Sequence, residues 1–202
     1  MDNSKQPLIV ANSPLVYYID VIPKKLIDIM VEEVMEDLEK IEQSNSPFKE
    51  ASVGTLIDNK IDLEVRNSKI LWWFEDHWAC SIISHYIGIA NKKCWEYDLN
   101  LLESVQVSVY NEGGHYKWHS DYGASNNEKW TRKLSASVLV SDPSEYDGGD
   151  LEFIDYHGNF IKAPKDRGSV IVFDSRIPHR VTPVTRGRRI SLVTWMYGPK
   201  LK

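Results

Sequence analysis

Two histidines and one aspartate in this chain have the residue types and the spacing of a metal site. His119 and Asp121 are two residues apart, so on a β-strand their side chains share one face and can reach one ion. Alone, this pair is more typical of an exposed strand end. His179 lies sixty residues further along, in the strand-like run IPHRVTPV, and can supply a third ligand from a facing strand. Two imidazoles and one carboxylate on one face of a metal form the ligand set of non-haem Fe(II), which leaves positions open for a bidentate co-substrate and O2.

The last strand-like run presents a guanidinium and a hydroxyl on one face. Arg189, Ser191, Val193 and Trp195 occupy alternate positions, so we expect them to point together into the interior of a barrel. A buried guanidinium requires an anion. No acidic residue nearby in the sequence obviously supplies one, whereas the distal carboxylate of 2-oxoglutarate would do so through two parallel hydrogen bonds. The alternative is an exposed arginine on an edge strand.

The elements that must position these residues follow from the hydrophobic pattern. Apolar residues at three- and four-residue steps predict an amphipathic helix from Pro23 to about Gln43 and a second helix from about Glu75 to Asn91. From about Leu101 the period changes to two, and strand-like runs follow near residues 105–110, 134–140, 151–154, 169–173, 179–184 and 190–196. Helices followed by many short strands predict an α+β fold, a β-sandwich or barrel with the helices packed on one outer face.

The composition is that of one globular domain, which we expect to span residues 1–202. Hydrophobic residues make up 42% of the chain, but no apolar run is long enough to span a bilayer, and the N-terminus lacks the features of a secretory signal. We therefore expect no membrane partner. The two cysteines have no CxxC spacing, and Cys80 falls within an apolar helical pattern, so we expect it to be buried. A reducing cytoplasm is the simplest location.

The net charge of -5 argues against general nucleic-acid binding, which usually needs a basic face. Four arginines nevertheless lie within ten residues, in RVTPVTRGRR. Such a cluster forms either a solvated or partner-binding surface or an anion site.

Three segments within residues 100–198 carry a resemblance to a known family. They are VQVSVYNEGGHYKWHSD, RKLSASVLVSDPSEYDGGDLEF and GSVIVFDSRIPHRVTPVTRGRRISLVTW. In this order, they resemble the prolyl 4-hydroxylase-like branch of the 2-oxoglutarate/Fe(II)-dependent oxygenase superfamily. The resemblance implies a double-stranded β-helix (jelly-roll) core over residues 100–198, with residues 1–99 as supporting helices and strands.

The resemblance also implies roles for individual residues. His119, Asp121 and His179 would bind iron, and Arg189 would anchor the C5 carboxylate of 2-oxoglutarate with the help of Ser191. Tyr110 stands where the family has a tyrosine that hydrogen-bonds the co-substrate, and otherwise it is a core aromatic residue.

Three further residues are candidates for contact with the substrate. Trp195 and Tyr116 would form part of the pocket wall, or would be plain core aromatics. Arg66 and the polar stretch of residues 122–131 are candidates for a substrate lid, and the alternative for the stretch is a surface connection.

The sequence departs from the family pattern at one position. Relatives often have a tyrosine as a second contact to the C5 carboxylate, and the corresponding residue here is Leu139. Ser135 and Ser137 share its face of the strand, and Ser137 could take the place of the tyrosine.

The function that the resemblance implies is hydroxylation of a C–H bond with Fe(II), 2-oxoglutarate and O2, supported by ascorbate, with release of succinate and CO2. The implied substrate is a prolyl residue of a protein or peptide, and a free amino acid or another small metabolite stays open. Nucleic-acid demethylases of the superfamily usually have an arginine six residues after the anchor, where this chain has Trp195. A different class, a non-catalytic cupin-like or jelly-roll interaction module, is less favoured because clustered HxH histidines are absent from the sequence.

Overall fold

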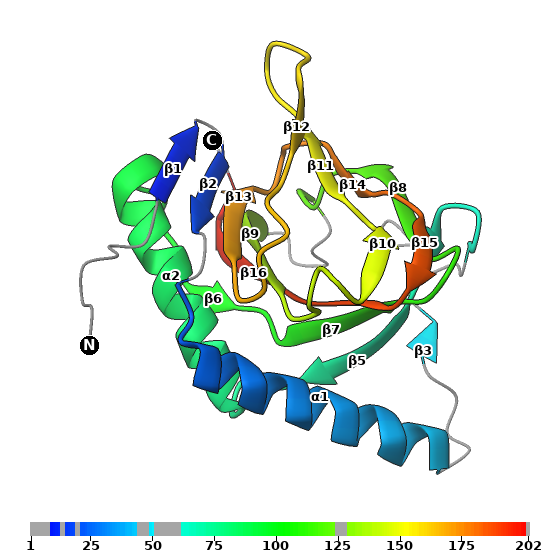
Figure 1. Ribbon diagram of the computed structural model, residues 1–202. Coiled ribbons are helices and arrows are strands. Elements are labelled where there is room, and N and C mark those ends of the chain that lie inside the picture. Colours follow the sequence, from blue (N-terminus) through cyan, green and yellow to red (C-terminus); the bar gives the residue numbers. More distant parts are fainter. Residues whose placement is uncertain are drawn as a thin grey trace, which may run out of the picture.

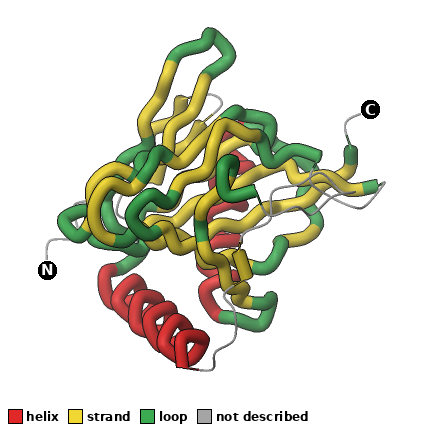
Figure 2. The backbone as a smooth tube through the Cα atoms, turned by 90° about the vertical axis from the view of Figure 1, so that its right-hand side faces the viewer, coloured by secondary structure: helices red, strands yellow, loops and turns green. Residues whose placement is uncertain are grey.

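A computed structural model of the chain describes residues 9–12, 15–18, 21–43, 49–50, 62–123 and 129–200 (Figure 1). Two β-sheets face each other, and two helices pack outside the larger one (Figures 1 and 2). The larger sheet has the order β1 (Ile9–Asn12), β2 (Leu15–Tyr18), β13 (Val170–Asp174), β9 (Trp130–Leu139), β16 (Arg189–Pro199), β7 (Val105–Tyr110), β5 (Lys69–Trp73) and β3 (Lys49–Glu50), with β6 (Leu101–Leu102) paired to β16.

The smaller sheet forms the opposite wall. Its order is β12 (Phe160–Lys162), β11 (Leu151–Ile154), β14 (His179–Val181), β8 (His115–His119) and β4 (Arg66–Asn67), and β10 (Tyr146–Gly148) pairs separately with β15 (Val184–Gly187). The pairings within both sheets are antiparallel. This is the double-stranded β-helix, so the predicted α+β class and jelly-roll core are confirmed. That residues 1–202 form a single domain stays a prediction.

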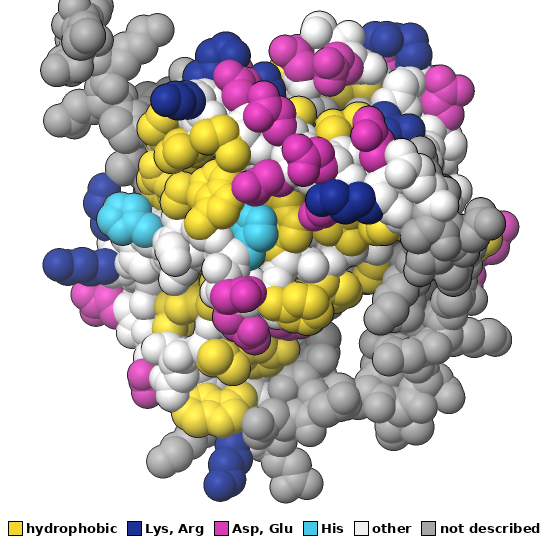
Figure 3. All heavy atoms as spheres, turned by 90° about the horizontal axis from the view of Figure 1, so that it is seen from below, with side chains coloured by type: hydrophobic (Ala, Val, Ile, Leu, Met, Phe, Trp, Pro, Cys, Tyr) yellow, Lys and Arg dark blue, Asp and Glu magenta, His cyan; other side chains and the backbone are white. Residues whose placement is uncertain are grey.

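The two helices cover the outer face of the larger sheet, as predicted. Helix α1 (Lys24–Gln43) buries its apolar stripe against α2 (Trp78–Cys94) and the sheet, and Met30 and Val34 have no exposed surface. Many acidic side chains are visible in the view from below, where the outer face of α1 lies (Figure 3). Neither described helix combines the length and the apolar character that a membrane span requires.

Helix α2 begins and ends about three residues later than the hydrophobic pattern predicts. Its first N–H groups need an acceptor outside the helix, and the ring of His77 accepts from the backbone N–H of Ala79 at 3.2 Å. At the other end, the N–H of Trp95 donates to Asn91 O at 3.1 Å. Cys80 is buried in this helix, as predicted.

Strand β7 separates two cores, which explains why all six of its residues are buried. Val105, Val107 and Val109 pack toward the helices, whereas Tyr110 packs into the second core, between the two sheets. Gln106 and Ser108 face the space between the sheets. The alternation of side chains in β7 therefore separates a side that faces the helices from a side that faces the pocket. It does not separate buried residues from exposed ones.

The expectation that the helices come first in the chain is wrong for the larger sheet. Strands β1 and β2 precede α1 and extend the sheet through the pairing of β2 with β13, in the register Val172↔Val16. Leu15 of β2 is fully buried in the core between the sheets. Burial of the Leu15 side chain favours the addition of β2 to this sheet.

Candidate functional site

The three predicted metal ligands come together at the end of strand β8. His119 lies directly opposite His179 in the register of β8 and β14. Asp121 follows two residues beyond His119, and its backbone N–H donates to Ser175 O at 2.9 Å. His119 Nε2 lies 3.7 Å from Asp121 Oδ1, and His179 Nε2 lies 3.4 Å from Asp121 Oδ2. One donor atom from each residue lies within 4.8 Å of the other two, which is the spacing of ligands around one ion.

Backbone carbonyls fix the orientation of both imidazole rings. His119 Nδ1 lies 2.8 Å from Lys117 O, and His179 Nδ1 lies 2.9 Å from Ile177 O. A carbonyl oxygen can only accept, so each Nδ1 carries the proton and donates it. The lone pair of each Nε2 then points into the space shared with Asp121, as a metal ligand requires.

The protonation states also suit a cation. Burial, together with the neighbouring His179, lowers the pKa of His119 to about 3. Burial by itself would raise the pKa of Asp121. The neighbouring His179 and His119 lower it by a larger amount, and the resulting pKa is about 2. Near neutral pH the site therefore presents a neutral imidazole from His119 and an ionised carboxylate, the forms in which these side chains bind metals.

The carboxylate of Asp121 is held by Ser135, which in turn contacts Ser175. Ser135 Oγ donates to Asp121 Oδ2 at 2.8 Å, and it lies 2.9 Å from Ser175 Oγ. Both serines are fully buried. Neither was predicted for this role, although Ser135 was placed on the pocket-facing side of its strand.

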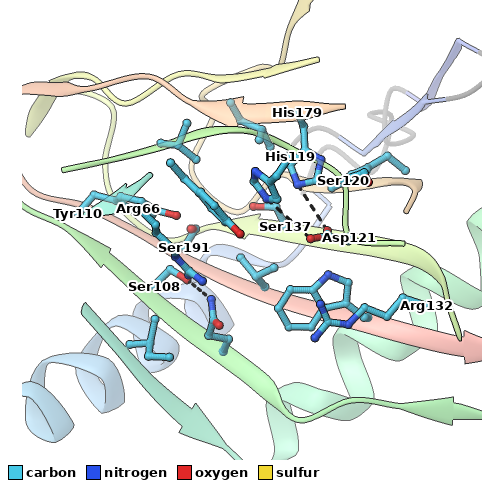
Figure 4. Close-up of a pocket in the computed structure, with 18 of the residues that line it drawn as sticks. Arg66, Ser108, Tyr110, His119, Ser120, Asp121, Arg132, Ser137, His179 and Ser191 are labelled. Atoms are coloured by element: carbon cyan, nitrogen blue, oxygen red, sulfur yellow. Dashed lines mark hydrogen bonds and ion pairs between the residues drawn. The ribbon is translucent and has the colours of Figure 1, made fainter. Parts of the chain in front are cut away.

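A cavity of about 360 Å³ extends from these ligands between the two sheets. In the close-up, Tyr110, Arg66 and Ser191 lie to the left, His119, His179 and Asp121 to the upper right, and Arg132 to the lower right (Figure 4). The volume is within the usual range of pockets for small ligands. The individual residues predicted to bind metal, co-substrate or substrate line the cavity, together with Ser137: Arg66, Tyr110, Tyr116, His119, Asp121, His179, Arg189, Ser191 and Trp195.

Arg189 lies in this cavity as a buried cation. Its guanidinium donates to Ser191 Oγ at 2.8 Å and lies 5.4 Å from the centre of the Tyr110 ring. The side chain is 3% exposed, and no carboxylate of the described residues forms an ion pair with it. A buried, unpaired guanidinium is costly unless an anion binds to it.

A tyrosine that the sequence did not single out lies beside Arg189. Tyr146 is 2% exposed, and its hydroxyl is buried without a hydrogen-bond partner among the described residues. Burial raises its pKa, and the Arg189 guanidinium partly offsets that effect. Tyr146 and Arg189 border a second, small cavity together with Ser137 and Leu139. Tyr146 thus brings a phenol from another strand close to Leu139, the position at which the family pattern led us to expect a tyrosine.

Gly149 allows this close packing. Its φ is +58°, and a Cβ at this position would lie 2.9 Å from Arg189 Cδ and 3.4 Å from Tyr146 Cε2. A side chain here would displace Arg189, so the GlyGly pair that precedes β11 has a direct structural role.

Arg132 is a second pocket residue that was not predicted. Its guanidinium binds both carboxylate oxygens of Glu103, at 2.7 and 2.8 Å, and stacks 3.7 Å from the centre of the Trp195 ring. Glu103 Oε2 also accepts from the Tyr197 hydroxyl at 2.6 Å. This pairing neutralises Arg132 within the pocket.

Tyr116 lies against the metal ligands. Its ring stacks on the imidazole of His119, with the ring centres 3.5 Å apart. The guanidinium of Arg66 lies 4.6 Å from the centre of the same ring. Arg66 is on β4, which pairs with β8 in the register Arg66↔Tyr116.

The arginine-rich segment contributes to both surface and site. Arg180 pairs with Glu152, and Arg186 pairs with Asp147, so these two arginines belong to the surface. Arg189 alone of this cluster lines the pocket among the described residues. In the proposed lid, residues 124–128 lie outside the described residues.

Comparison with known proteins agrees with this geometry. A sequence model of the 2OG-Fe(II) oxygenase superfamily matches residues 105–197. A PKHD-type hydroxylase of Teredinibacter turnerae is 37% identical over 95 residues, which cover 45% of this chain and 41% of the relative. The chain therefore spans less than half the length of these curated relatives.

Two solved structures of prolyl hydroxylases share the fold of this chain. A prolyl-4-hydroxylase from Pseudomonas putida has a TM-score of 0.69 at 20% identity, over 91% of this chain and 92% of that one. A prolyl hydroxylase from Trichoplax adhaerens, in complex with a peptide fragment of the hypoxia inducible factor oxygen degradation domain, has a TM-score of 0.68 at 20% identity, over 91% of this chain and 83% of that one. The prolyl 4-hydroxylase-like architecture that the sequence motifs implied is thus confirmed.

Proposed function

We propose that this protein is an Fe(II)- and 2-oxoglutarate-dependent dioxygenase that hydroxylates a C–H bond and releases succinate and CO2. One observation carries the proposal: a single cavity holds both a set of three metal ligands and a buried arginine that has no anionic partner among the described residues. A purely structural jelly roll, or a module that only binds a metal, needs no such arginine beside the ligands.

His119, Asp121 and His179 fit Fe(II). Their donors are two imidazole nitrogens and one carboxylate, oriented by hydrogen bonds to Lys117 O, Ile177 O and Ser135. When bound, the iron supplies the activation of O2 that oxidises the co-substrate and the substrate. The protein residues contribute by holding this ligand geometry in a largely buried pocket.

The Arg189 side of the cavity fits the distal carboxylate of 2-oxoglutarate. The guanidinium of Arg189 would bind the carboxylate through two hydrogen bonds, while Ser191 holds the guanidinium in place. Tyr110 borders the same region, and the unpartnered hydroxyl of Tyr146 can donate to the carboxylate or support Arg189.

The substrate that we propose is a prolyl residue of a protein or peptide. The likeness to prolyl hydroxylases, one of them in complex with a peptide, supports this proposal. We place the reaction in the cytoplasm, since both thiols of the chain are free and a reducing compartment keeps thiols in that form. Ascorbate would support turnover by keeping the iron reduced.

The experiment is a turnover assay. The purified protein is incubated with Fe(II), ascorbate, 2-oxoglutarate and O2, and succinate is measured. We expect succinate from the wild type and none above background from His119→Ala, while Arg186→Gln, which changes an exposed arginine paired with Asp147, stays at the wild-type rate. Equal succinate from the wild type and His119→Ala would contradict the proposal. A mass increase of one oxygen on an added proline peptide would identify the acceptor.

A further inference from the structure

Arg66 is a second buried cation in the same cavity. The side chain is 7% exposed and lines the pocket that holds the metal ligands. Its Nε donates to Ser68 Oγ at 2.9 Å, and its guanidinium lies over the Tyr116 ring. Within the described part of the chain, no carboxylate forms an ion pair with it.

Among the described residues, most of the hydrogen-bond donors of Arg66 have no partner. A guanidinium has five N–H donors, and the bond to Ser68 uses one of them. The contact with Tyr116 stabilises the positive charge, but it supplies no acceptor for the terminal nitrogens. A guanidinium with free donors in a confined pocket is suited to bind a carboxylate through two parallel hydrogen bonds.

The other two arginines of the pocket are accounted for. Glu103 neutralises Arg132, and Arg189 would hold the distal carboxylate of 2-oxoglutarate. The 2-oxo acid group at the other end of the co-substrate would bind the metal. Arg66 therefore has an anion site that neither the described residues nor the co-substrate fills.

We propose that Arg66 binds a carboxylate of the substrate, which makes the substrate an anionic compound. This inference rests on the proposed function, because it assigns the remaining space of the pocket to the substrate. Tyr116 contacts both the Arg66 guanidinium and the imidazole of His119, so the carboxylate would lie near the metal. This carboxylate belongs either to a free amino acid or to an acidic side chain of a peptide. In both cases it lies within a few bonds of the carbon that is oxidised.

The test follows Arg66 directly by nuclear magnetic resonance. The full chain is loaded with Zn(II), which does not turn over, and its oxoglutarate affinity is measured by calorimetry. Acetate is then added at saturating oxoglutarate while the Nε–H signal of Arg66, assigned by its loss in Arg66→Lys, is recorded. We expect a saturable shift with acetate, and binding at least tenfold weaker for the neutral analogue acetamide. A shift that does not saturate, or that is equal for both probes, would overturn the inference.

Two variants separate this inference from the proposed function. Measured by calorimetry, because the reporting N–H is absent from the variant, Arg66→Gln should bind acetate no more tightly than acetamide and keep the oxoglutarate affinity within about threefold of the wild type. Arg186→Gln should change neither quantity. A large loss of oxoglutarate affinity in Arg66→Gln would assign Arg66 to the co-substrate and overturn the inference. Failure of the wild type to bind oxoglutarate would contradict the proposed function, and the acetate titration would still test Arg66 without it.

Two competitors identify the source of the carboxylate. Free L-proline has the carboxylate of an amino acid, whereas the capped dipeptide acetyl-Pro-Asp-amide has that of an acidic side chain. Displacement of acetate by L-proline supports an amino-acid substrate, and displacement by the dipeptide supports an acidic peptide.

Discussion

The imidazole of His119 lies opposite that of His179 across the β8–β14 pair, with ring centres 4.1 Å apart. Each ring is held by a carbonyl from its own strand or from the turn before it, and the two rings meet Asp121 from different strands. The metal site is therefore built into the pairing of two strands, and its geometry depends on their register.

Ser135 is expected to determine how tightly the site holds its metal. Ser135→Ala removes the hydroxyl that donates to Asp121 Oδ2 and leaves the carboxylate free to rotate. Loss of such a supporting hydrogen bond usually weakens metal binding by about 10- to 100-fold. Competition with a chelator measures the change, and Ser144→Ala, at an exposed serine, is the control. Unchanged affinity in Ser135→Ala would show that the serine has no part in positioning Asp121.

Gly149→Ala should weaken 2-oxoglutarate binding without affecting the metal. The new methyl group would clash with Arg189 Cδ at 2.9 Å, whereas the metal ligands lie on other strands. Gly158→Ala is a matched control, because its φ of +82° imposes a similar backbone strain but no atom lies within 4 Å of the added Cβ. Calorimetry of oxoglutarate binding should show a loss for Gly149→Ala only. Equal losses in the two variants would mean that strain alone, and not the contact with Arg189, is responsible.

Tyr146→Phe should change stability and binding in opposite directions. The hydroxyl is buried without a partner, so its removal should leave the ligand-free protein as stable as the wild type or more stable, by about 1 kcal/mol. If the phenol supports the co-substrate, oxoglutarate affinity should fall about tenfold. Thermal unfolding and calorimetry measure the two effects. A variant that binds oxoglutarate as well as the wild type would remove Tyr146 from the site.

Asp174 is expected to stabilise the turn that leads to the metal ligands. Its carboxylate accepts from the Tyr97 hydroxyl and from Arg176, each at 2.6 Å at Oδ2. The next residue, Ser175, accepts the backbone N–H of Asp121. Asp174→Asn should lower the free energy of unfolding by about 1–3 kcal/mol. We expect a value near the lower limit, because Arg176 is partly exposed to solvent.

The pH dependence of that loss has a defined sign. Burial alone would raise the pKa of Asp174, but the hydrogen bonds from Arg176 and Tyr97 lower it below its ordinary value. A carboxyl with a depressed folded pKa stabilises the fold above its unfolded pKa of about 3.9, and that contribution disappears as the pH falls through the folded pKa. Urea unfolding should therefore show a full difference between wild type and Asp174→Asn at pH 7, and a smaller one in acid below about pH 4. A difference that grows in acid would contradict this assignment.

Some site residues could be predicted from the sequence and others could not. The difference lies in whether their position depends on an irregular strand register. The pair His119–Asp121 and the face shared by Arg189, Ser191 and Trp195 follow from a period of two, and the structure brings them into one pocket. Arg132 does not follow this period, because it is an odd number of residues from Ser137 and yet both side chains line the pocket. The register of β9 with β16 shifts so that Leu134 pairs with Met196 and Arg132 with Tyr197, which leaves Lys133 as an extra residue.

Such bulges reverse the facing of every residue beyond them, and no local pattern in the sequence marks this one. A similar shift between β8 and β14 brings Tyr116 and His119 to one pocket, although they are an odd number of residues apart. Tyr146 was missed for another reason, because its contact with Arg189 depends on the close approach of two distant strands at Gly149. In the sequence, the clue was the absence of a tyrosine at Leu139.

The most direct test of the account is the binding of 2-oxoglutarate to the iron-loaded protein without O2. Chelation of Fe(II) by a 2-oxo acid gives a visible charge-transfer absorption, which reports the metal and the co-substrate at once. We predict that this absorption saturates at one oxoglutarate per chain in the wild type, requires a much higher oxoglutarate concentration in Arg189→Gln, and is lost in His179→Ala. No absorption in the wild type, or an unchanged titration in Arg189→Gln, would contradict the assignment of this pocket to iron and 2-oxoglutarate.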